Sequence, residues 1–174
     1  YYFMNSNVKI SGLLNKPSSV TFSAWVYTDL LDTRSGSNGS EIISLGDHAG
    51  VRLTNTGIIG FYNYASGSSN MRKTTDTSGS YVNTGWHHIV YTTSGSTFTL
   101  YVDGVVQTMT FTTGANARFF WNDVLTGADG IQFGAKADTN GNYQGPLTGL
   151  IDEVRIYNRA LSASEVQALY KSGA

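Results

Sequence analysis

The chain of 174 residues contains no cysteine. This absence excludes disulfide bonds, cysteine nucleophiles and zinc sites built on cysteine, although it leaves secretion open. Charge is also scarce, since charged residues make up 13% of the chain and the formal net charge is -1. A surface that follows a phosphate backbone needs clustered lysine and arginine, so the composition argues against a nucleic-acid partner. No apolar run is long enough for a membrane-spanning helix.

Only two prolines occur, whereas glycine, serine, threonine and tyrosine are abundant. This mixture is typical of short strands joined by tight turns. Val20 to Tyr27 alternates apolar with polar residues, as a half-buried strand does. Asp103-Gly104 predicts a two-residue hairpin turn, because both central residues of such a turn need positive φ. Further strands are predicted at residues 41–45, 51–54, 58–64, 86–92, 97–102, 105–112, 131–135 and 147–157. This spacing indicates an all-β sandwich or jelly roll.

Helical signals are confined to the C-terminal segment. Ser162 and Glu165 have the spacing of a capping box, in which each side chain bonds the backbone N–H of the other residue. Leu161 can pack on Val166 as a hydrophobic staple. An apolar stripe at helical spacing follows, and Gly173 can end the helix. The sequence therefore predicts one short helix after the last strand.

Asp152 stands out within the predicted strand at 147–157. Strict alternation places it on the same face as three aliphatic residues, Leu150, Val154 and Ile156. An unpaired carboxylate on such a face costs several kcal/mol. It therefore needs a bound cation, several backbone N–H donors, or a bulge that turns it away. A bound metal is the sharper alternative, and a bulge or N–H donors from a crossing loop are the simpler one.

Three blocks in the same order carry a family resemblance: Trp86-His87-His88-Ile89-Val90-Tyr91, then the strand and turn at 97–104, then the segment at 149–162. With Phe22-Ser-Ala-Trp-Val26 as an early strand, the chain resembles the laminin-G-like group of the concanavalin A-like lectin/glucanase superfamily. The resemblance covers essentially the whole chain. It implies a two-sheet antiparallel jelly roll, and members of the group often bind carbohydrate and hold calcium.

The resemblance also implies a calcium site. The aspartate of the family that corresponds to Asp152 supports calcium together with groups near the N-terminal strand. In this chain Asn5 or Asn7 stands where the family usually has an acidic residue. Asn5 offers a neutral amide oxygen, and calcium affinity follows ligand charge. Structural calcium held by Asp152 and Asn5 is the expectation that results.

Catalysis is not expected. Glucanases on this scaffold carry closely spaced acidic residues on one strand, and retaining chemistry needs two carboxylates about 5–5.5 Å apart. The chain has three glutamates, and none is part of such a group. Glu165 is engaged by the predicted cap, and alternation turns Glu153 away from Asp152. His87 and His88 are expected to face opposite sides of one strand and to have structural roles.

Two aromatic clusters are candidate sugar sites, because sugar rings stack on flat aromatic faces while polar groups bind their hydroxyls. If Ile59 and Phe61 point into the core, Tyr62 and Tyr64 point outward, with Arg72 close behind in the sequence. The second cluster is Phe119-Phe-Trp121, followed by Asn122 and Asp123. Three successive aromatic residues cannot all be buried on one side, and exposed aromatic clusters mark interaction surfaces.

Together these observations predict a non-catalytic, lectin-like carbohydrate-binding module. Its length fits one domain, residues 1–174, and Tyr1 to Met4 resembles the middle of a strand, so we expect a domain excised from an extracellular multidomain protein. The predicted sugar-binding residues are Trp121, Tyr62, Tyr64, Arg72, Asn122 and Asp123. The alternatives are an adhesion module that binds a protein receptor and an architectural spacer.

Overall fold

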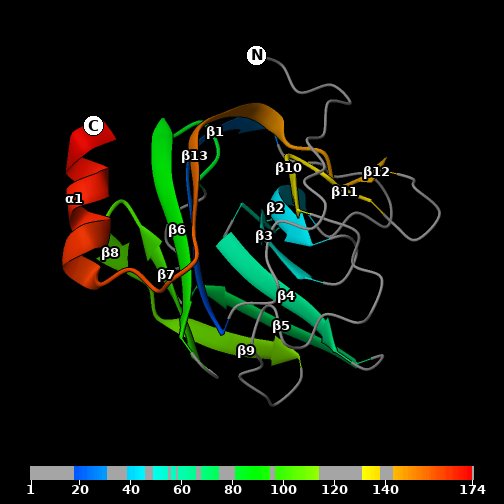
Figure 1. The fold of residues 1–174 in the computed structure, drawn as a ribbon. Helices are drawn as coiled ribbons and strands as arrows, with labels where there is room; N and C mark the ends of the chain where they lie inside the picture. The colour runs from blue at the N-terminus through cyan, green and yellow to red at the C-terminus, as the bar shows by residue number, and fades with distance from the viewer. Residues whose placement is uncertain are drawn as a thin grey trace.

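The computed structural model describes residues 18–30, 39–45, 49–54, 56–57, 59–65, 68–74, 81–94, 97–113, 131–137 and 143–173. These residues form two large antiparallel sheets and one C-terminal helix (Figure 1). The strands are β1 (Ser19–Leu30), β2 (Ser40–Leu45), β3 (Ala49–Leu53), β4 (Ile59–Ala65), β5 (Ser68–Thr74), β6 (Trp86–Ser94), β7 (Thr97–Val102), β8 (Val105–Val106), β9 (Met109–Thr113), β10 (Ile131–Phe133), β11 (Lys136–Ala137), β12 (Tyr143–Gln144) and β13 (Thr148–Tyr157). The helix α1 spans Ala163–Gly173.

One sheet has the strand order β13-β1-β6-β7-β8, the other has the order β10-β2-β3-β4-β5-β9, and β11 pairs with β12. A shared apolar core lies between the two large sheets. Alternate residues of β1, among them Val20, Phe22 and Val26, enter it from the five-stranded sheet. Val51 and Ile59 enter it from the six-stranded sheet. The predicted all-β sandwich of jelly-roll type is therefore confirmed.

The predicted hairpin turn at Asp103-Gly104 is also confirmed, with φ angles of 52° and 75°. The Asp103 carboxylate accepts a hydrogen bond from the His88 N–H at 2.8 Å and lies 2.7 Å from His87 Nδ1. Burial alone would raise the pKa of Asp103, but these two hydrogen bonds lower it below its usual value. The turn is thus tied to β6, and the His-His and Asp-Gly motifs have a common structural role.

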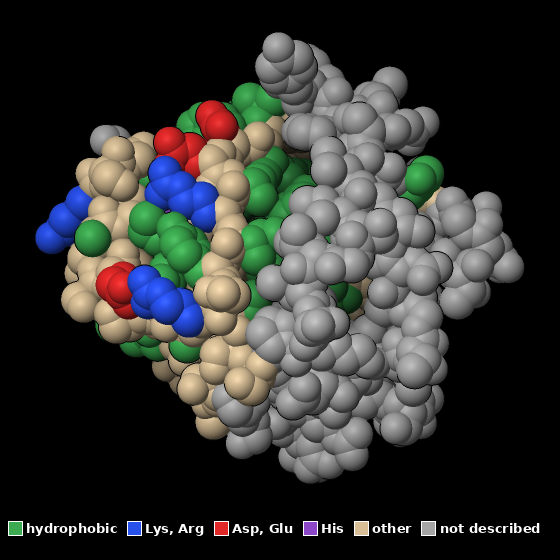
Figure 2. All heavy atoms as spheres, viewed as in Figure 1, with side chains coloured by type: hydrophobic (Ala, Val, Ile, Leu, Met, Phe, Trp, Pro, Cys, Tyr) green, Lys and Arg blue, Asp and Glu red, His purple; other side chains and the backbone are tan. Residues whose placement is uncertain are grey.

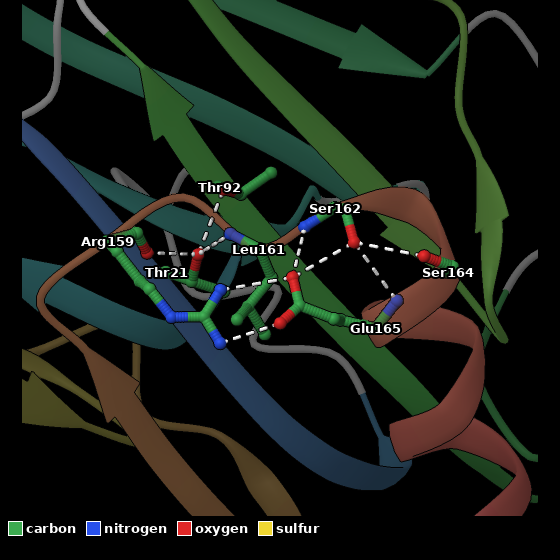
Figure 3. A network of polar contacts seen from close by, with 7 residues as sticks. All are labelled: Thr21, Thr92, Arg159, Leu161, Ser162, Ser164 and Glu165. Atoms are coloured by element: carbon green, nitrogen blue, oxygen red, sulfur yellow. Dashed lines mark hydrogen bonds and ion pairs between the residues drawn. The ribbon is translucent and has the colours of Figure 1, made fainter.

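The helix begins with the predicted capping box (Figure 3). The Ser162 N–H donates to Glu165 Oε2 at 2.8 Å, and the Glu165 N–H donates to Ser162 Oγ at 3.3 Å. Arg159 adds a two-pronged contact to the same carboxylate. Chiefly through this bond, and through those from Ser162, the pKa of Glu165 falls to about 2.

The helix is fixed to the outer face of the five-stranded sheet. Leu161 and Val166 are buried together, as the staple predicts. Leu161 N–H donates to Thr21 Oγ1 of β1 at 3.0 Å, and the Tyr170 ring stacks on Trp25 with centroids 5.7 Å apart. Among the residues that the structure describes, no helix is both long and apolar enough to span a membrane.

A β-bulge corrects the predicted orientation of Asp152. Ser23 pairs with Arg155 and Trp25 with Asp152, so two residues of β13 lie opposite the single residue Ala24. One of the two, Glu153, has a φ of 48°. The extra residue reverses the alternation, so that Asp152 is exposed and accepts the Glu153 N–H at 2.7 Å. The prediction that Asp152 shares a face with Ile156 is wrong, and the bulge is the alternative that the structure contains.

Candidate functional site

The candidate site is a polar cluster on the distal face, by which we mean the face of the six-stranded sheet that is turned away from the five-stranded sheet. In β3, Val51 and Leu53 belong to the core, so alternation turns Arg52 to the distal face. Glu41 of β2 is its cross-strand partner. An irregularity between Glu41 and Ile43 lets Ile42 and Ile43 both enter the core while Glu41 faces outward.

Four side chains meet in this distal cluster: Glu41, Arg52, Tyr62 and Lys136. Arg52 Nη1 lies 3.6 Å from Glu41 Oε1, and the Arg52 Cζ lies 4.4 Å from the centroid of the Tyr62 ring. Lys136 Nζ, from β11, lies 5.6 Å from the same centroid. The arrangement joins an ion pair to two cation–π contacts on one aromatic ring.

Glycine makes this packing possible. Tyr62 pairs with Gly50 across β3 and β4, and a Cβ at Gly50 would lie 2.8 Å from Cε1 and Oη of the Tyr62 ring. The ring therefore lies directly on the backbone of β3. Gly60 is the cross-strand partner of Arg52, and its lack of a side chain leaves room for the long arginine side chain.

The electrostatics of the cluster centre on Glu41. Burial raises the pKa of Glu41 to about 7, against the opposing effects of Arg52, of Lys136 and of a hydrogen bond from Tyr62. Glu41, Arg52 and Tyr62 are each 1% exposed. Within the described residues the cluster thus links β2, β3, β4 and β11 through polar contacts that little water can reach.

Catalytic or metal chemistry has little support in this cluster. Glu41 is its only carboxylate, whereas glycoside hydrolysis uses a pair. Nowhere in the described part of the chain do three His, Cys, Asp or Glu side chains gather in a way that could hold a metal ion. The cluster is therefore best understood as the polar framework of the distal face.

The structure corrects the prediction for Tyr62. We expected it to point outward and stack on a sugar, but its ring is buried under Arg52 and Lys136 contacts. The reason is that alternation fixes only the face of a strand, and this face is itself covered. Tyr64 lies two positions further along β4, whereas Arg72 of β5 pairs with Phe61, which is itself the partner of the core residue Val51. The register therefore places these two predicted residues on neighbouring strands but at positions on opposite faces of the sheet.

The remaining predicted residues lie outside the described part of the chain. These are Trp121, Asn122 and Asp123 of the predicted sugar site and Asn5 of the predicted calcium site. The sequence analysis missed Glu41, Arg52 and Lys136 as members of a cluster. A usable signal existed for Arg52, because a single charged residue inside the apolar run Val51-Arg52-Leu53 requires a buried partner.

Surface charge gives no sign of a nucleic-acid site on the described part of the face shown in Figure 2. Basic and acidic side chains lie beside one another there instead of gathering by sign. Two ion pairs among the described residues are Arg155 with Glu153 at 2.8 Å and Arg159 with Glu165 at 2.7 Å. On the described part of this face, such pairing leaves no basic stripe for a phosphate backbone.

Several solved structures are similar to this chain. Domain 4 of AbnA, an extracellular GH43 arabinanase from Geobacillus stearothermophilus, was solved in complex with arabinotriose; it has a TM-score of 0.64 and 21% identity, over 94% of this chain and 72% of that one. The CBM40 of the Ruminococcus gnavus IT-sialidase, solved with α2,3-sialyllactose, has a TM-score of 0.66 and 15% identity, over 95% and 96%. The binding domain of Paraclostridial Mosquitocidal Protein 1 has a TM-score of 0.63 and 21% identity, over 98% and 42%.

At these identities the solved structures support the fold alone. No curated protein matches the chain. Residues 4–167, however, match a laminin-G family model described as the concanavalin A-like lectin/glucanases superfamily. Since the match spans nearly the whole chain and agrees with the two-sheet sandwich, the chain belongs to the laminin-G-like family of the concanavalin A-like lectin/glucanase superfamily.

Proposed function

We propose that this chain is a non-catalytic carbohydrate-binding module of an extracellular multidomain protein. The observation that carries the proposal is the similarity, over more than nine-tenths of this chain, to two modules solved with bound oligosaccharides. One of them belongs to an enzyme described as extracellular. Fold similarity alone does not define a ligand, so the proposal needs a site and a direct test.

The positions of the glutamates support a role without catalysis. All three glutamates of the chain lie among the described residues, and each makes an ion pair or hydrogen bond with a nearby residue of the chain. Glu41 contacts Arg52 in the distal cluster, Glu153 contacts Arg155, and Glu165 caps the helix. A retaining glycosidase would instead need two free carboxylates facing one sugar.

For the sugar site we propose the aromatic residues Trp121 and Tyr64, with Asn122 and Asp123 as partners for sugar hydroxyls. The support is chemical, since flat aromatic rings beside amide and carboxylate groups are what pyranose and furanose rings require. Tyr62 takes a different part in this proposal. As a buried ring under Arg52, it holds the sheet in place instead of touching the ligand.

The first test is a glycan array on the isolated chain, followed by titration calorimetry with the strongest hit. Arabinotriose and sialyllactose should be included as probes. We expect Trp121→Ala to weaken binding about tenfold, because loss of one stacked ring costs on the order of 1 kcal/mol. Val106→Ala is the matched control, since Val106 is an exposed apolar residue on β8.

One result would contradict the proposed function, and another would contradict only the proposed site. An array without hits would favour a protein receptor or a spacer role, and partner capture would then separate these alternatives. Unchanged affinity in Trp121→Ala, with an unchanged melting temperature, would reject the proposed site while leaving the function in place.

A further inference from the structure

An aromatic pair, the half-buried Tyr27 and the exposed Trp86, lies on the outer face of the five-stranded sheet. The two residues are direct cross-strand partners on β1 and β6. Their ring centroids are 6.0 Å apart, and the ring planes are inclined by 46°. Trp86 is 42% exposed, whereas Trp25, two positions before Tyr27, is covered by Tyr170 of the helix. The pair therefore begins where the cover provided by the helix ends.

The backbone that presents Trp86 is held firmly on the side of the preceding turn. Asn83 has a φ of 56°, and its N–H donates to Thr28 O at 2.8 Å. Thr84 Oγ1 lies 2.8 Å from His87 Nε2, and the other ring nitrogen of His87 contacts Asp103. These contacts hold the backbone before Trp86 and the residue after it. A backbone that is already held in place loses little entropy when a ligand stacks on the ring it carries.

The pair is part of an apolar row across the sheet. Leu150 of β13 pairs with Tyr27, and Tyr27 pairs with Trp86, so the row reads Leu150, Tyr27, Trp86. Leu150 and Tyr27 are half-buried, and Trp86 is the most exposed of the three. An apolar row of this kind suits a flat, extended ligand.

Charge decides which ligand the row suits. Two acidic residues lie near the row on these strands, Asp29 on β1 and Asp152 on β13. Oδ1 of Asp29 is buried, whereas Asp152 is exposed beside the row, at the position paired with Trp25, so Asp152 is the carboxylate that a ligand can reach. Arg155, the nearest cation along β13, is occupied by Glu153 at 2.8 Å. Carboxylates bind sugar hydroxyls well but repel anionic groups. The surroundings therefore favour an uncharged sugar over a sialylated or uronic one.

We propose that Tyr27 and Trp86 form a second carbohydrate-binding site, which takes neutral glycan chains and lies on the opposite sheet from Tyr64 of the site proposed above. Trp86 stacks on the apolar face of one sugar ring, Tyr27 supports the neighbouring ring, and Asp152 accepts hydroxyl hydrogen bonds. Two sites on opposite sheets let one module join two glycan chains, or increase its avidity for a polysaccharide. This site extends the proposed function but can be tested separately.

The experiment is fluorine NMR on the chain labelled with 5-fluorotryptophan. The sequence has three tryptophans, so each resonance can be assigned by single phenylalanine substitutions. The neutral probes are cellohexaose, xylohexaose and mannohexaose, and the anionic probe is sialyllactose. We expect the Trp86 resonance to shift saturably with at least one neutral hexasaccharide and to move little with sialyllactose.

Variants then test the contact itself. Trp86→Ala should weaken binding of the active hexasaccharide at this site about tenfold, whereas Trp86→Phe, which keeps a ring, should weaken it only a few-fold. Val106→Ala, an exposed apolar residue on the same sheet, should change nothing. Equal melting temperatures of the variants show that folding is intact.

The outcomes separate the two sites. A Trp86 resonance that no neutral probe moves overturns this inference, whether or not the Trp121 resonance responds. A shift at Trp121 alone supports the proposed function and rejects the second site. A shift at Trp86 alone supports the second site and rejects the site proposed at Trp121. An equal response of Trp86 to sialyllactose overturns the preference for neutral sugars.

Discussion

Glu41 illustrates how burial changes one residue. Its carboxyl group lies on a sheet between Arg52 and Lys136, yet desolvation outweighs both cations and raises its pKa to about 7. In the unfolded chain the pKa of this group would be near its ordinary value of 4.5. A raised carboxyl pKa means that the folded state prefers the protonated form. The contribution of Glu41 to stability is therefore complete below about pH 4.5 and declines as the pH rises through about 7.

We expect Glu41→Gln to make stability less dependent on pH in this range. The wild-type chain should lose on the order of 1–3 kcal/mol relative to the variant between pH 5 and pH 8. Denaturant unfolding at several pH values measures this difference. His88, whose pKa is lowered by burial, affects the lower end of the range equally in both proteins.

Glu153→Gln is the matched control, since Glu153 is an exposed glutamate of the same chain. If the control and Glu41→Gln have the same pH profile as the wild type, the account of Glu41 is wrong. An unchanged profile would mean that the polar cluster is hydrated in solution.

At the scale of elements, two irregularities decide which side chains the sheets present. The bulge at Glu153 turns Asp152 out of the face that simple alternation assigns to it. The irregularity after Glu41 does the same for β2, where two successive isoleucines enter the core. One inserted residue reverses every later side chain, so alternation is reliable only between bulges.

The helix offers an element that can be tested alone. We expect Ser162→Ala to destabilise the chain by about 1 kcal/mol, because the Glu165 N–H loses its acceptor at the first turn. Thermal unfolding monitored by tryptophan fluorescence, to which Trp25 beside Tyr170 of the helix contributes, measures the effect.

Ser164→Ala is the control, since Ser164 is in the same turn and contacts only the Ser162 hydroxyl among the described residues. Its effect should be close to zero. Equal destabilisation by both variants would show that the hydrogen bond from the Glu165 N–H to Ser162 adds no stability beyond what any serine in this turn provides.

Across the whole molecule, the two sheets have different outer faces. The five-stranded sheet carries the helix and, beyond its end, the half-buried Tyr27 paired with the exposed Trp86. The six-stranded sheet carries the buried polar cluster around Tyr62. A sandwich of this kind can bind ligands on either outer face, while the single core between the sheets holds the two sheets together.

Calcium binding by Asp152 and Asn5 stays a prediction, and it is a property of the whole molecule. The described residues offer Asp152 as an exposed carboxylate with one oxygen bonded to the Glu153 N–H, which fits a single metal ligand but not a complete site. If calcium links Asp152 to the N-terminal segment, EDTA should lower the melting temperature by several degrees, and Asp152→Asn should remove that response. Equal melting temperatures with calcium and with EDTA would reject the site.

The sequence by itself determined the class of fold, the hairpin at Asp103-Gly104 and the capped helix, because each follows from local rules that neighbouring residues obey. It also indicated the family, through three motifs in order. Tertiary structure alone decided the surroundings of Tyr62 and Asp152. Burial of Tyr62 depends on Arg52 of the paired strand β3 and on Lys136 of β11, and the orientation of Asp152 depends on how β13 pairs with β1. Neither follows from the alternation of a single strand, which is why alternation assigned both side chains to the wrong surroundings.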